Sequence, residues 1–185
     1  PRIASRASSS MSVWHGCFML PELLGEFTAA LVHGEPRLTK DVDLTVGVGL
    51  DGLYDLIGIV DSVGWSPLAD PDEFTRKTMV LPCRVPGSPL RVDLILADSP
   101  YEAEALTRAR ELGATREDGI RYATAEDVIV HKLIAGRPRD LEDARSILLK
   151  QSSLDRAWIR RWLAAYATLS GEPLVDRFER LESGD

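Results

Sequence analysis

The chain has 185 residues, of which 44% are hydrophobic and 28% charged, so we expect one main globular unit, long enough to carry a helical appendage. No apolar run approaches the roughly 20 residues that cross a bilayer, so we expect no membrane partner. The formal net charge of −7 argues against nucleic-acid binding through the whole surface.

The N-terminal residues 1–12 are rich in serine and carry two arginines, but no long apolar core follows them. We therefore expect a flexible tail rather than a signal peptide. In a chain without a signal peptide, the two cysteines Cys17 and Cys83 are expected to be reduced. Reduced cysteines indicate a cytoplasmic protein.

The first third of the chain mixes short helical and extended patterns. Residues 14–24 are apolar but interrupted by Pro21, which predicts a short helix or turn leading into a strand near residues 22–24. Residues 27–33 predict a short helix that ends at Gly34. The β-branched run over residues 42–46 predicts a strand, and the apolar spacing over residues 50–63 predicts a helix.

The rest of the chain passes from strands to helices. Residues 70–72 are expected to form a loop, and residues 74–83 and 90–96 to form a hairpin of two strands. Helices are predicted from residue 99 to about 112 and from 124 to about 135, with a short extended piece at 120–123 between them. Three further helices are predicted over residues 140–150, 154–168 and 173–181. This order indicates an α/β core followed by a helical cap.

Three acidic residues stand out within the apolar strand patterns. Asp41 and Asp43 lie two residues apart, so their side chains point to the same face of the predicted strand. Two neighbouring carboxylates repel each other unless a positive charge lies between them, so the pair is either a cation site or an electrostatic liability. Asp93 is a third acid in the next strand pattern. Together they predict a magnesium site, with structural salt bridges as the alternative.

Positive charge collects late in the chain. Residues 131–161 contain eight Lys and Arg against four acids, whereas residues 1–130 contain 12 against 20. This stretch either meets a phosphate backbone, in binding that weakens with salt, or forms an ordinary solvated helical face. Within it, Trp158 and Trp162 lie four residues apart on a predicted helix. We expect them to be core contacts, with stacking on an RNA base as the alternative.

Two segments resemble a known family. The pattern Gly34-Glu-Pro-Arg37-x-Thr39-x-Asp41-x-Asp43, after Leu24-Gly25 and before Arg91-Val-Asp93, resembles the nucleotidyltransferase superfamily of the DNA polymerase beta type. His131-Lys132-Leu133 followed by Arg137-Pro-Arg-Asp140-Leu-Glu-Asp143 is similar to the AbiEii and MenT nucleotidyltransferase toxins of bacterial toxin-antitoxin pairs. The resemblance covers roughly residues 23–149.

The resemblance implies an α/β (α+β) fold. A polymerase beta-like nucleotidyltransferase core, with a mixed sheet flanked by helices, would occupy residues 13–123. A C-terminal helical subdomain would follow over residues 124–185.

The resemblance also implies roles for individual residues. Asp41, Asp43 and Asp93 would hold two Mg²⁺ ions, which prefer carboxylate oxygens and substrate phosphates. Lys132 would neutralise charge on the nucleoside triphosphate and complete the catalytic set with the three acids. Arg37 or Arg139 would grip phosphate oxygens, and Asp140 or Asp143 would position that lysine or arginine. The implied nucleotide-binding residues are Gly25, Glu26, Arg37, Thr39, Lys132, Arg139, Asp140 and Asp143.

One position departs from the superfamily pattern. Gly25 is followed by Glu26 where the superfamily usually has Ser or Gly, at the start of a helix whose backbone amides would cradle the triphosphate. A carboxylate that faced inward would repel phosphate. Either Glu26 points away from the nucleotide, or nucleotide binding is weak or altered.

The family resemblance implies a magnesium-dependent nucleotidyltransferase toxin. It would transfer nucleotides from a nucleoside triphosphate to RNA, with the 3′ end of tRNA as the expected acceptor, and so block translation. A cognate antitoxin protein is the expected partner. The alternatives are transfer to a small molecule or a protein side chain, and a catalytically inactive module of the same fold that binds a partner.

Overall fold

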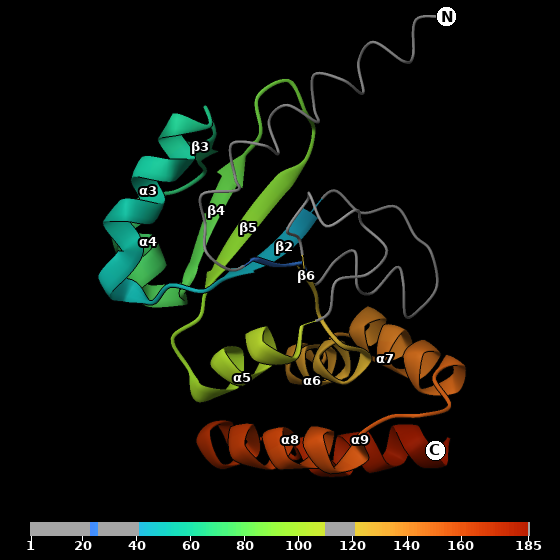
Figure 1. The fold of residues 1–185 in the computed structure, drawn as a ribbon. Coiled ribbons are helices and arrows are strands. Elements are labelled where there is room, and N and C mark those ends of the chain that lie inside the picture. Colours follow the sequence, from blue (N-terminus) through green and yellow to red (C-terminus); the bar gives the residue numbers. More distant parts are fainter. Residues whose placement is uncertain (1–22, 26–40, 110–120, 185) are drawn as a thin grey trace, which may run out of the picture. The chain divides into compact units, whose positions relative to one another are not determined.

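The computed structural model describes residues 23–25, 41–109 and 121–184 of the chain (Figure 1). The helix predicted over residues 27–33 lies outside this part of the chain. The described residues form two compact units. Among the described residues, the first unit contains 23–25, 41–109 and 121–122, and the second contains 123–184.

Within the described residues, a mixed sheet of six strands forms the centre of the first unit (Figure 1). Its strand order is β3-β4-β5-β2-β1-β6. The parallel neighbours are β2 with β5 and β1 with β6, and all the other neighbouring strands are antiparallel. The strands are β1 (Leu23–Gly25), β2 (Asp41–Val46), β3 (Ser66–Pro67), β4 (Val80–Arg84), β5 (Arg91–Leu96) and β6 (Arg121–Tyr122).

One face of the central strands forms the hydrophobic core of this unit. It buries alternate residues of the two parallel strands: Leu44, Val46, Val92, Leu94 and Leu96. The helix α3 (Leu53–Ser62) packs Leu53, Leu56 and Val60 into the same core. This apolar spacing is the one that predicts a helix over residues 50–63, although its first turn, η2 (Leu50–Gly52), is a 3-10 turn.

The sequence prediction was wrong over residues 70–79. The expected loop is the start of helix α4 (Pro71–Thr78), and the expected strand begins only at Val80. The Asp70 carboxylate accepts a hydrogen bond from the Glu73 amide at 2.7 Å and so caps the helix. Pro71 occupies the first turn, where the missing N–H costs nothing. In Figure 1, α3 and α4 lie together on one side of β4 and β5.

The helix α5 (Pro100–Arg108) follows β5. Ser99 and Glu102 form a capping box at its start, and Pro100 occupies the predicted first position. The helix ends earlier than the predicted residue 112, and residues 110–120 lie outside the described part of the chain.

The second unit consists of helices that pack around α6. They are α6 (Ala125–Ala135), α7 (Pro138–Lys150), α8 (Arg156–Ser170) and α9 (Leu174–Ser183). The other three helices all contact α6, which buries Val128, Ile129, Val130 and Leu133. A helix that is apolar on most sides must be covered by neighbours. The predicted class, a mixed sheet with helices followed by a helical C-terminal part, is confirmed.

None of the helices in the described ranges is both long enough and apolar enough to cross a bilayer.

The two faces of α7 give a matched test of the second unit's core. Ile147 is 0% exposed and Leu149, on the same helix, is 79% exposed. We expect Ile147→Ala to lower the free energy of unfolding by about 2–5 kcal/mol, because it leaves a cavity. Leu149→Ala should change it by less than about 0.5 kcal/mol. Urea denaturation of the full chain measures both, and equal losses would contradict the assigned faces.

Candidate active site

Two acids of the first unit lie on the sheet face opposite to the hydrophobic core. β2 and β5 are parallel and in register, with Asp43 directly beside Asp93. Val92 and Leu94 point into the core, so Asp93 between them points to the other face, and Asp43 shares that face. Both side chains are partly buried. Neighbouring strands therefore hold two carboxylates side by side.

Arg91 is the charge partner of Asp93. Its Nε donates a hydrogen bond to Oδ1 of Asp93 at 2.7 Å. Like charges directly opposite each other destabilise a sheet, so the arginine offsets part of the repulsion between Asp43 and Asp93. Arg91 had no predicted role of its own. Its position two residues before Asp93, on the same face of a predicted strand, was the available signal.

The third predicted acid, Asp41, begins β2, where its backbone lies in register with Arg91. Its side chain is not among those that the structure describes, so the three-acid site stays a prediction. Where side chains are described, no group of three His, Cys, Asp or Glu is arranged to hold a metal ion. Magnesium often takes only one or two carboxylates and completes its shell with water and substrate phosphates. The adjacent carboxylates of Asp43 and Asp93 fit that requirement.

The predicted phosphate-binding segment falls mostly outside the described ranges. Gly25 is the last residue of β1 and pairs with Leu44 of β2, one position along the strand from Asp43. The other predicted residues of this segment, Glu26, Arg37 and Thr39, lie outside the described residues.

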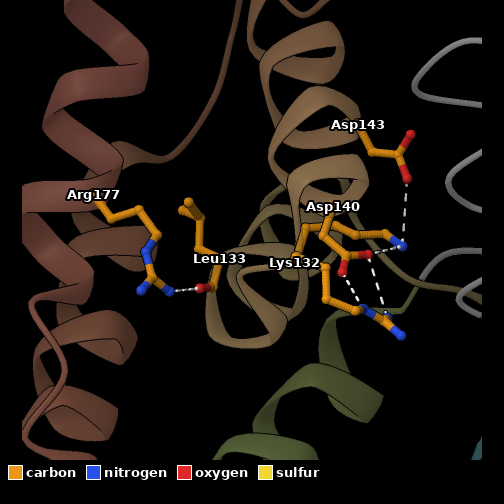
Figure 2. Close-up of polar contacts among 6 residues, drawn as sticks. Lys132, Leu133, Asp140, Asp143 and Arg177 are labelled. Carbon is orange, nitrogen blue, oxygen red and sulfur yellow. Dashed lines mark hydrogen bonds and ion pairs between the residues drawn. The ribbon is translucent and has the colours of Figure 1, made fainter. Parts of the chain in front are cut away.

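A second polar cluster lies where α6 meets α7 (Figure 2). Lys132 Nζ is 3.0 Å from Oδ1 of Asp140 and 3.5 Å from Oδ2 of Asp143. Arg137 Nε is 2.5 Å from the other carboxylate oxygen of Asp140. The Asp140 side chain is only 4% exposed. The cluster is therefore a buried carboxylate held by two cations, with Asp143 as a second acid on Lys132.

The environment of Asp140 favours its ionised form. Burial on its own would raise the pKa of this carboxyl, but hydrogen bonds from Arg137 and Lys132 and their positive charges outweigh burial. The pKa of Asp140 consequently lies below its ordinary value. At neutral pH the carboxylate stays charged and keeps hold of Lys132.

The local backbone explains why these side chains meet. Gly136 ends α6 in the left-handed conformation, at φ +65°, and its amide donates to the Lys132 carbonyl at 3.0 Å. Pro138 then opens α7, so only two residues separate the helices. Asp140 and Asp143 lie three residues apart and share one face of α7. That face is turned towards Lys132.

The helix α9 contacts the C-terminal end of α6 through Arg177 (Figure 2). Arg177 Nη1 donates a hydrogen bond to the Leu133 carbonyl at 2.7 Å. Carbonyls in the last turn of a helix have no partner within that helix, so this contact satisfies one of them. A Cβ at Gly136 would lie 2.7 Å from the same Arg177 nitrogen. Arg177 therefore packs closely over the end of the helix that carries Lys132.

The structure distinguishes between the two arginines at the start of α7. Arg137 contacts Asp140, although its side chain is 76% exposed. Arg139, which was predicted together with Arg37 as a candidate phosphate ligand, is exposed on the first turn of α7. The signal for Arg137 was its position three residues before Asp140.

The basic stretch is partly neutralised by acids of α9. Arg156 and Arg160 approach the Glu182 carboxylate at 2.6 and 2.8 Å. Glu182 lies outside residues 131–161, so a local count of charges misses it. These ion pairs favour the solvated helical face over an RNA-binding surface.

The two tryptophans of α8 make structural contacts. Trp162 is buried, and the Trp158 indole donates a hydrogen bond to Asp127 at 2.8 Å. Their rings meet edge to face, with centroids 5.8 Å apart. Arg161 lies over both rings. The expected role of Trp162 as a core contact is confirmed.

Comparisons with known proteins give structural likenesses alone. No protein-family model matches the chain, and no curated protein matches it significantly. JHP933 from Helicobacter pylori is 16% identical, with 99% of this chain and 87% of that chain covered and a TM-score of 0.49. A protein of H. pylori named as a candidate nucleotidyltransferase is 14% identical, with 99% and 93% covered and a TM-score of 0.43. At these scores neither likeness identifies the reaction of this chain.

The depressed pKa of Asp140 predicts a specific sensitivity to acid. Its contribution to stability is complete well above the ordinary pKa of 3.8 and is lost as the pH falls through the lower pKa of the folded state. Asp140→Asn should lower the free energy of unfolding by about 1.5–3 kcal/mol at neutral pH. It should also flatten the loss of stability in acid.

Urea denaturation of the wild type and the variant over a series of pH values measures both effects. Glu142→Gln is the matched control, because Glu142 is exposed on the same helix. An Asp140→Asn protein with wild-type stability at neutral pH would contradict the described network.

Proposed function

We propose that the chain is a magnesium-dependent nucleotidyltransferase. It transfers nucleotides from a nucleoside triphosphate to RNA, with the 3′ end of tRNA as the acceptor, and acts as a toxin restrained by an antitoxin protein. The observation that carries the proposal is the placement of Asp43 beside Asp93 on the sheet face opposite to the core. Neighbouring carboxylates repel each other, and a cation bound between them would offset that repulsion. Two acids placed together on one sheet face are therefore candidates for a metal site.

The proposed reaction joins the acceptor to the α-phosphate. The hydroxyl oxygen of the acceptor attacks the α-phosphorus, the bond to the β-phosphate oxygen breaks, and pyrophosphate leaves while the hydroxyl proton passes to solvent. Bound magnesium would lower the pKa of that hydroxyl and stabilise charge on the phosphate oxygens. Asp43 and Asp93 would hold it, together with Asp41.

Lys132 is the proposed cation for the triphosphate. Its ammonium is a compact charge on a flexible stem, suited to neutralising phosphate oxygens. Asp140 and Asp143 hold this ammonium at 3.0 and 3.5 Å, which limits the orientations that the side chain samples. Because the pKa of Asp140 is depressed, this hold persists throughout the neutral range.

The acid pair gives the direct test of this function. The full chain is incubated with labelled nucleoside triphosphates, magnesium and total tRNA, and label transfer is measured. We expect Asp43→Asn and Asp93→Asn each to lower the transfer rate by at least about 100-fold, because each removes a carboxylate from the metal. Asp55→Asn is the control, since Asp55 is an exposed acid of α3.

The outcomes separate the proposal from its alternatives. Transfer that survives both substitutions would contradict the metal site. Transfer to small molecules or proteins with indifference to RNA would replace the acceptor. A wild-type chain that transfers no label from any of the four triphosphates to any of these acceptors would favour an inactive partner-binding module.

A further inference from the structure

Two arginines lie directly opposite each other where β4 and β5 are joined. Arg84 ends β4, Arg91 begins β5, and the two residues are cross-strand partners. Directly opposed residues share one face of a sheet. Arg91 lies two residues before Asp93, so both arginines are on the face that carries the acid pair. Both side chains are exposed.

Hydrogen bonds within the loop stabilise the connection between β4 and β5. The Ser88 amide donates to the Val85 carbonyl at 3.2 Å, and the Leu90 amide donates to the Ser88 hydroxyl at 3.2 Å. The hairpin therefore fixes the two arginines as neighbours. In Figure 1, the loop joins the neighbouring ends of β4 and β5.

Opposed like charges destabilise a sheet, and this pair is only partly compensated. Arg91 is bound to Asp93. Arg84 has Ser66 as its neighbour on β3, and its side chain forms no ion pair or hydrogen bond in the described part of the chain. An anion bound between the two guanidinium groups would remove the repulsion. The planar fork of an arginine side chain suits phosphate oxygens in particular.

The acids occupy the next position along the same face. Asp93 has two cross-strand neighbours, Pro82 on β4 and Asp43 on β2. This row of residues lies two positions along the strands from the paired Arg84 and Arg91. In an RNA 3′ end, the terminal hydroxyl and the phosphate that precedes it belong to one nucleotide. Two residues along a strand span about 7 Å, so with the hydroxyl at the acids that phosphate would lie within the reach of an arginine side chain.

We propose that Arg84 and Arg91 bind a backbone phosphate of the RNA acceptor next to its terminal hydroxyl. This inference rests on the proposed function and assigns a substrate class to the same site. A small-molecule or protein acceptor that lacks a phosphate beside its hydroxyl would leave this arginine pair unused. The pair therefore selects a nucleic-acid acceptor.

RNA binding without turnover tests the inference. A short 5′-labelled single-stranded RNA with a free 3′ hydroxyl is titrated with the full chain, and fluorescence anisotropy is measured over a range of salt concentrations. We expect Arg84→Gln to weaken RNA binding about 10-fold and to reduce the slope of log K against log salt by about 0.7. Arg84→Lys should keep the wild-type slope, because it keeps the charge, and lose only part of the affinity.

Lys77→Gln is the matched control, because it removes the same charge from the exposed surface of the first unit, where Lys77 pairs with Glu73. It should leave RNA affinity within about twofold of wild type. Arg84 is outside the predicted triphosphate site, so Arg84→Gln should also leave triphosphate affinity unchanged.

Three results would overturn the inference. Equal effects of Arg84→Gln and Lys77→Gln on RNA would contradict the arginine site and leave the proposed function standing. Loss of triphosphate affinity with RNA affinity unchanged would assign the arginines to the nucleotide. A wild-type chain that binds no RNA would contradict the RNA acceptor together with the arginine site.

Discussion

The candidate site depends on the in-register pairing of β2 with β5. Parallel strands alternate their side chains in step, so the pairing that buries Leu44 with Leu94 also sets Asp43 beside Asp93 on the opposite face. A slip of one residue in β2 would move its acid into the core and its apolar residues out of it. Burial on one face therefore enforces the acid pair on the other. The ion pair of Asp93 with Arg91 makes that arrangement tolerable.

The second unit also contains a carboxylate whose charge must be compensated. Asp140 is buried, so its charge is acceptable only because Arg137 and Lys132 both bind it. The tight corner at Gly136 and Pro138 brings these residues together, and Arg177 of α9 packs on the end of α6. In each unit a carboxylate is paired with at least one neighbouring cation. Such charged groups are candidates for binding phosphate or metal.

Local patterns predicted much of this fold, and tertiary pairing accounts for most of what they missed. The strands β2 and β5 and the helices α6 to α9 follow from apolar periodicity and helix signals, because burial imposes those patterns. The helix α4 was missed because Asp70 and Pro71 favour a loop as readily as a helix start. The ion pair of Arg156 with Glu182 joins two helices, so the charge count of residues 131–161 could not predict it. The pairing of Arg84 with Arg91 depends on the strand register, which the sequence patterns did not predict.

The central claim is that Asp43 and Asp93 form a metal-binding pair that serves a nucleoside triphosphate. Calorimetric titration of the preformed magnesium complex of a non-hydrolysable nucleoside triphosphate into the full chain tests it most directly. The account predicts heat of binding for the wild type and for the exposed-acid variant Asp55→Asn, and its loss in Asp43→Asn and Asp93→Asn. Equal binding of this complex by all four proteins, or by none of them, would contradict it.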